Sequence, residues 1–171
     1  MRRELTIRIS VLDPPRGVAM QVQRGRDGLL PAAHGTSELL WFEFFLRLGP
    51  PQPDGRPNFL GEFAQGPRDA RFVYVNSGQR AGQTDSGWDR RAKVSLMGIT
   101  AAHIEAALCE PDAVLEARIQ GTGRDGGPAC ATVPLLDGGW HVRRNREPLS
   151  KRHALRPPPH PSRGPRRARF T

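Results

Sequence analysis

The polar stretch from residue 82 to residue 91 holds the side chains best suited to chemistry. It places one tryptophan, Trp88, between two acids, Asp85 and Asp89, with amides, hydroxyls and arginines close by in the chain. Such a tryptophan can stack on a planar or sugar-like ligand while its polar neighbours supply hydrogen bonds. The alternative is that Trp88 packs on a sheet and the two acids cap turns. The candidate ligand-binding residues of this stretch are Gln83, Thr84, Asp85, Ser86, Trp88, Asp89 and Arg90.

Asp85 and Asp89 are also weak candidates for catalysis. Two carboxylates beside one pocket can titrate apart, so that one serves as an acid and the other as a base. A hydrolase acting on a small polar substrate is therefore an alternative function. However, no nucleophile elbow surrounds Ser86, and the histidines lack the close spacing of metal ligands. The sequence favours binding over catalysis and predicts neither a metal nor a cofactor.

A second stretch, residues 121–126, matches the G-x-G-x-x-G string of dinucleotide-binding proteins. That fingerprint requires a helix to open at the third glycine, so that the helix N-terminus faces the pyrophosphate. Here Gly127, Pro128 and a strand follow, which predicts a wide turn instead of a nucleotide site. The loop 121–127 could lie beside the loop 82–91 and present Arg124 and Asp125 to a shared ligand.

Alternation of apolar and polar residues predicts the strands that must position these loops. The alternating segments are residues 5–11, 18–23, 40–48, 71–75, 92–96, 115–119, 130–135 and 140–142. We expect the first two segments to pair as a hairpin. Thr100 is a good N-cap for a short helix at about 101–109, which Pro111 ends. The predicted fold is mainly β: an antiparallel sandwich or barrel of about eight short strands with one short α-helix.

The charge distribution divides the chain in two. Acidic and basic side chains balance over residues 1–142, so residues 143–171 carry the whole net charge of +9. The latter segment is rich in arginine and proline and has few apolar side chains, which predicts disorder. We therefore expect one globular β-rich domain, 1–142, and a basic disordered tail, 143–171. The tail could contact nucleic acid or an anionic surface non-specifically, or be an extension without a function.

The apolar segments of the chain bear on where the protein is located in the cell. The first residues contain no continuous apolar run of the kind that a signal peptide needs. The apolar run at 39–48 is too short for a membrane span and contains two charged residues. We expect a cytoplasmic protein without a membrane span. The two cysteines, Cys109 and Cys130, neither require nor exclude a disulfide.

Several strings of this sequence resemble those of a small, uncharacterised bacterial family catalogued as a domain of unknown function. They are FLGEFAQGP at 59–67, RFVYV at 71–75, AGQTDS at 81–86, Trp88, RRAK at 90–93, GIT at 98–100, LEAR at 115–118 and GTGRDGGP at 121–128. The resemblance covers about residues 4–142 and leaves out the tail, as the charge distribution does. It implies no activity, ligand or partner, so a small ligand and a protein partner both remain open.

Overall fold

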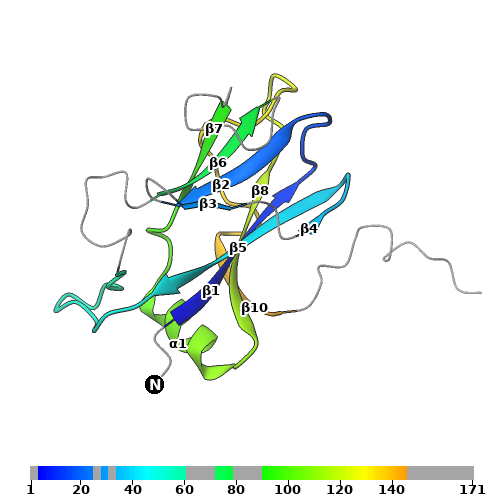
Figure 1. Ribbon diagram of the computed structural model, residues 1–171. Coiled ribbons are helices and arrows are strands. Elements are labelled where there is room, and N and C mark those ends of the chain that lie inside the picture. The colour runs from blue at the N-terminus through cyan, green and yellow to red at the C-terminus, as the bar shows by residue number, and fades with distance from the viewer. Residues whose placement is uncertain (1–3, 25–27, 31–33, 61–71, 79–89, 146–171) are drawn as a thin grey trace, which may run out of the picture.

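Ten strands and one helix make up the part of the chain that the computed structural model describes, residues 4–24, 28–30, 34–60, 72–78 and 90–145. The mainly β fold with one short helix, predicted from the sequence, is confirmed (Figure 1). The elements are β1 (Glu4–Leu12), β2 (Ala19–Arg24), β3 (Gly28–Leu30), β4 (His34–Gly35), β5 (Leu39–Arg47), β6 (Phe72–Gly78), β7 (Arg90–Ser95), α1 (Ala101–Cys109), β8 (Ala113–Gln120), β9 (Ala131–Thr132) and β10 (Trp140–Arg144).

The strands form two five-stranded sheets. The first sheet has the order β10-β8-β1-β5-β4, and the second has the order β3-β2-β6-β7-β9. Most neighbours are antiparallel, but β1 pairs in parallel with β8, and β7 in parallel with β9. A parallel pair needs a long crossover. Between β1 and β8 the chain supplies that crossover by building most of the second sheet and α1.

The expected hairpin between the first two alternating segments is not formed. β1 pairs with β5 and β8, whereas β2 pairs with β3 and β6 in the other sheet. The turn between β1 and β2 contains two residues with positive φ, Asp13 at 47° and Gly17 at 68°. This turn carries the chain from one sheet to the other. The alternation therefore predicted both strands correctly, but the prediction that they pair with each other is wrong.

The core lies between the two sheets and is one continuous cluster. On β1 the inward residue Ile7 lies beside Phe44 of β5 and Leu115 of β8, and the three are almost fully buried. The second sheet contributes Val22, Val73, Val75, Ala92 and Val94. Burying each of these valine, leucine, isoleucine and phenylalanine side chains stabilises the fold by about 1.5–3 kcal/mol. The two sheets therefore form a sandwich, and the alternate residues of each strand face away from the core.

Helix α1 and Trp140 close one end of the sandwich. The backbone N–H of His103 donates to the Thr100 hydroxyl at 3.3 Å, and the Thr100 N–H donates back to His103 Nδ1 at 3.2 Å. This reciprocal cap starts the helix at the predicted residue. Trp140 is 3% exposed, and its Nε1 donates to the Ser95 carbonyl at 3.1 Å. That bond joins the first sheet to the end of β7.

The last strand includes two arginines that the charge distribution assigned to the tail. Arg143 and Arg144 belong to β10 and lie opposite Val114 and Ala113 of β8. The remainder of the tail, from residue 146, is outside the described residues. In the part of the chain that is described, no helix is long and apolar enough to cross a membrane.

Candidate functional site

Most of the polar stretch singled out in the sequence lies outside the described residues. This is true of Gln83, Thr84, Asp85, Ser86, Trp88 and Asp89. The hydrolase hypothesis, which needs Asp85 and Asp89, therefore stays a prediction. So does nucleic-acid contact through the tail from residue 146 onward. Arg90, Arg124 and Asp125 are described, and they show where the two predicted loops leave the sandwich.

Arg90 and Asp125 lie together at one end of the second sheet. Arg90 begins β7, and its Nη2 lies 3.0 Å from Asp125 Oδ2, although the two residues are 35 positions apart. Asp125 Oδ1 also accepts from the backbone N–H of Gly127 at 3.1 Å. That N–H first, and then the Arg90 guanidinium, hold the pKa of the Asp125 carboxyl below its usual range. Both side chains are about half exposed, so their outer edges stay open to solvent.

The sequence predicts a wide turn for the loop that carries Asp125, and the structure shows a turn closed by backbone hydrogen bonds. The Gly123 N–H donates to the Gly127 carbonyl at 2.7 Å, and Gly126 adopts a positive φ of 76°. Thr122 forms a bridge with Pro128. After Gly126 the chain bends and forms that bridge at Pro128 before it reaches β9, so the helix that a dinucleotide fingerprint needs does not open there. Arg124 is exposed and has no hydrogen bond or ion pair with another described residue.

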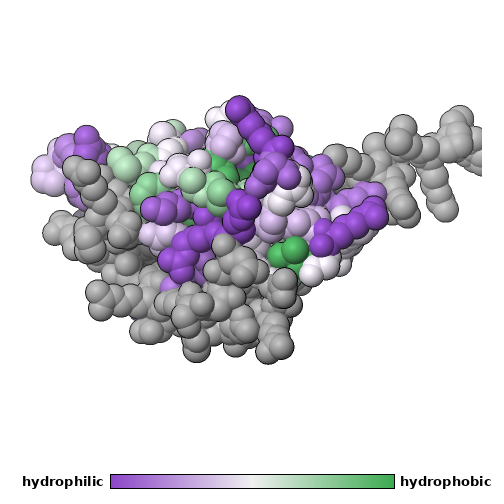
Figure 2. Space-filling view, turned by 90° about the horizontal axis from the view of Figure 1, so that it is seen from above, coloured by the Kyte–Doolittle hydropathy of each residue, from purple (hydrophilic) through white to green (hydrophobic). Residues whose placement is uncertain are grey.

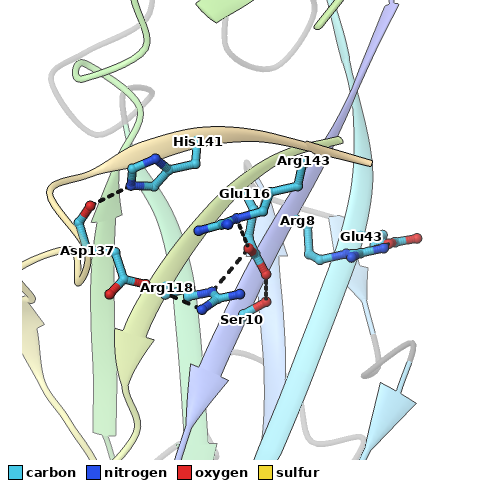
Figure 3. Close-up of polar contacts among 8 residues, drawn as sticks. All are labelled: Arg8, Ser10, Glu43, Glu116, Arg118, Asp137, His141 and Arg143. Carbon is cyan, nitrogen blue, oxygen red and sulfur yellow. Dashed lines mark hydrogen bonds and ion pairs between the residues drawn. The ribbon is translucent and has the colours of Figure 1, made fainter. Parts of the chain in front are cut away.

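A second polar cluster, which the sequence interpretation missed, lies on the outer face of the first sheet (Figure 3). Its centre is Glu116 of β8, which is 2% exposed. The Glu116 carboxylate accepts from the Ser10 hydroxyl at 2.6 Å and lies 3.1 Å from Arg118 Nε and 3.0 Å from Arg143 Nε. These partners come from three strands, so the carboxylate ties β1, β8 and β10 together. A buried carboxylate this well satisfied is typical of a structural network.

Arg8 extends the same network toward β5. It is 3% exposed and lies 4.8 Å from the ring centre of Trp41. Its Nε donates to Glu43 at 2.8 Å, and its Nη2 donates to Asn145 Oδ1 at 2.6 Å. Arg118 also pairs with Asp137 at 3.4 Å. With that residue the network holds three arginines and three carboxylates, so it balances its own charge. These residues share one face of the sheet because of the register of β1 against β5 and β8. The sequence does not show that register, so it could not predict the cluster.

The outer face of the second sheet carries a third cluster of a different kind. Asn76 and Gln23 are buried there, and Asn76 Nδ2 donates to Gln23 Oε1 at 3.1 Å. Arg91 donates to both amides at 3.0 and 3.1 Å and stacks over Tyr74 at 4.9 Å. Figure 2 looks down on the end of the molecule where β6 and β7 stand uppermost in Figure 1. It shows strongly hydrophilic side chains next to smaller apolar areas.

Metal and thiol chemistry find little support among these side chains. Within the described ranges, no group of three or more His, Cys, Asp or Glu residues is placed to hold a metal ion. Cys109 and Cys130 are both exposed, free thiols. Cys130 Sγ accepts a long contact of 3.5 Å from Arg90 Nη1. That contact first, and then Asp125, raise the pKa of the Arg90 guanidinium.

Comparison with known proteins identifies the chain by family alone. The model of a family of unknown function, DUF5990, matches residues 5–143. No curated protein and no solved structure matches the chain. The match spans both sheets, from β1 into β10, and it agrees with the resemblance that the sequence strings carried.

Proposed function

The chain belongs to the family of unknown function DUF5990, and we propose that its β-rich domain is a binding module that holds its ligand beside Arg90 and Asp125. The ligand is a small polar molecule or a polar segment of a protein partner. The candidates from Gln83 to Asp89 directly precede Arg90 in the chain, so they belong to the same proposal. Arg124, in the turn that carries Asp125, is a further candidate for contact with the ligand.

The ion pair between Arg90 and Asp125 is the observation that carries this proposal. It joins the end of the 82–91 stretch to the 121–127 turn, the two loops whose residue types favour binding. The guanidinium and the carboxylate are half exposed and are held by Cys130 and Gly127 respectively. A positive and a negative group fixed side by side complement a ligand that carries both hydrogen-bond donors and acceptors. Loops supported by a rigid sheet are also where binding residues concentrate.

The proposal is tested by nuclear magnetic resonance of the full chain against a panel of small polar metabolites. We expect at least one compound to shift the backbone amides of Arg90, Gly123, Asp125 and Gly127. The amides of α1, at the opposite end of the sandwich, should not move. The variant Arg90→Gln should weaken binding about tenfold, since a hydrogen bond to a charged group is lost.

A matched control comes from another exposed ion pair. Arg56 pairs with Asp54 at 3.3 Å in the loop after β5, so Arg56→Gln removes a similar surface contact elsewhere. Binding should be unchanged in that variant. If no compound shifts the Arg90 and Asp125 amides, or if Arg90→Gln binds as the wild type does, the proposed small-ligand site is wrong.

A further inference from the structure

The outer face of the second sheet arranges its side chains in two rows across β2, β6 and β7. Strand register places the members of each row directly opposite one another. Their neighbours Val22, Val75 and Ala92 point into the core, so the rows point away from it. The first row is Gln21, Asn76 and Arg91, and the second is Gln23, Tyr74 and Lys93. Amides thus lie on the β2 side and cations on the β7 side.

The charge of this face is unbalanced, unlike that of the first sheet. Arg91 and Lys93 are cationic, and none of the outward residues described on β2, β6, β7 and β9 is acidic. Within the described ranges, the contacts of the Lys93 ammonium are with two rings, at 5.7 Å to the centre of Phe72 and 5.9 Å to that of Tyr74. No ion pair among the described residues includes it. The face therefore complements an anion.

Gln21 adds an acceptor on the opposite side of the same face. Its Oε1 is buried and has no hydrogen-bond partner among the residues that the structure describes. A buried acceptor without a partner is costly, and native proteins rarely keep one without a use. The neighbouring amides differ, because Asn76 and Gln23 bond each other and Arg91. Gln21 is the member of the first row that still needs a donor.

We propose that this face is a second binding site, one for a small phosphate ester that carries hydroxyl groups, such as a sugar phosphate. The Lys93 ammonium pairs with the phosphate, and Gln21 Oε1 accepts a hydrogen bond from a hydroxyl. The two lie on strands separated by β6 and two residues apart along the strands, which places their Cα atoms about 12 Å apart. A phosphorylated sugar spans such a distance, whereas inorganic phosphate does not. The Arg91 guanidinium lies between them, stacked over the Tyr74 ring and bonded to Asn76 and Gln23.

The experiment titrates the full chain with ribose 5-phosphate, glucose 6-phosphate and glycerol 3-phosphate, following the side-chain resonances of Gln21 and Lys93. Ribose and inorganic phosphate serve as partial probes. At least one phosphate ester should shift both resonances and bind more tightly than either partial probe. Lys93→Gln should weaken its binding about tenfold, and Gln21→Ala should weaken it severalfold, because each removes one anchoring group.

Arg47→Gln is the matched control, since Arg47 is an exposed cation on the outer face of the other sheet. It should leave binding unchanged. The proposal is overturned if no ester shifts the Gln21 resonance, if Lys93→Gln binds as the wild type does, or if inorganic phosphate binds equally well. Asp125→Asn separates the two sites. If Asp125→Asn abolishes binding of the ester, the ester binds beside Arg90 and Asp125. If binding is unchanged in that variant, the ester binds on the outer face of the second sheet.

Discussion

The Ser10 hydroxyl donates a 2.6 Å hydrogen bond to the Glu116 carboxylate across 106 positions of sequence. The bond joins β1 to β8 where the two strands run in parallel. Arg118 and Arg143 complete the surroundings of the same carboxylate. A buried charge is tolerated only when it is paired and hydrogen-bonded. The burial of Glu116 therefore requires that β1, β8 and β10 all be in place to supply its partners.

Replacing Glu116 with alanine should destabilise the fold by about 1–3 kcal/mol. It leaves the buried Ser10 hydroxyl and the Arg143 guanidinium without the carboxylate, while Arg118 keeps Asp137. Urea unfolding followed by circular dichroism measures the change. Glu105 on α1 is exposed, so Glu105→Ala serves as the control and should alter stability little. A loss below about 1 kcal/mol for Glu116→Ala would mean that the network does not hold the strands together.

The Asp125 carboxyl should titrate below the usual range of an aspartate. Its folded-state pKa is lowered, so its contribution to stability is present above the unfolded value and is lost as the pH falls through the lowered one. A carbon-detected pH titration of the side chain measures the midpoint. In Arg90→Gln the midpoint should rise only part of the way, because the hydrogen bond from the Gly127 N–H remains. A complete return to the ordinary value would contradict a contribution from that hydrogen bond.

Gly121→Ala should be destabilising by about 1–3 kcal/mol through overpacking. An added Cβ would lie 2.7 Å from Val11 Cγ1 and 2.9 Å from Pro14 Cα, and the second of these is a backbone atom that cannot turn aside. Gly127→Ala in the same loop is the matched control, since its nearest contact would be 3.5 Å. Thermal unfolding of both variants should show a lowered midpoint for Gly121→Ala alone. Equal midpoints would show that the β1 turn can move away.

Trp140→Phe should cost about 1 kcal/mol, because it removes the hydrogen bond from Nε1 to the Ser95 carbonyl but keeps most of the apolar surface. Trp140→Ala should cost about 3–5 kcal/mol, since it also leaves a cavity between α1 and the sheets. Denaturant unfolding compares the two variants. If the phenylalanine variant were as unstable as the alanine variant, the bond to β7 would matter more than the packing.

The sequence by itself determined where the longer strands lie and which of their residues share a face. The short strands β3 and β4 are not among the predicted segments. Alternation at 5–11, 40–48 and 92–96 predicts β1, β5 and β7, and the reciprocal cap at Thr100 and His103 starts α1 at the expected residue. These features are local, since alternate side chains of a strand point to opposite faces whatever the strand pairs with. The family followed from the same strings of residues, and it brings no function with it.

Only the tertiary structure decided which strands are neighbours, and so which side chains meet. Nothing local to β1 indicates that it lies between β5 and β8, or that β2 joins the other sheet. The contacts of Arg90 with Asp125, of Ser10 with Glu116 and of Lys93 with Tyr74 all cross between strands or loops. Each depends on long-range register, which is set by how the whole core packs and not by any one segment.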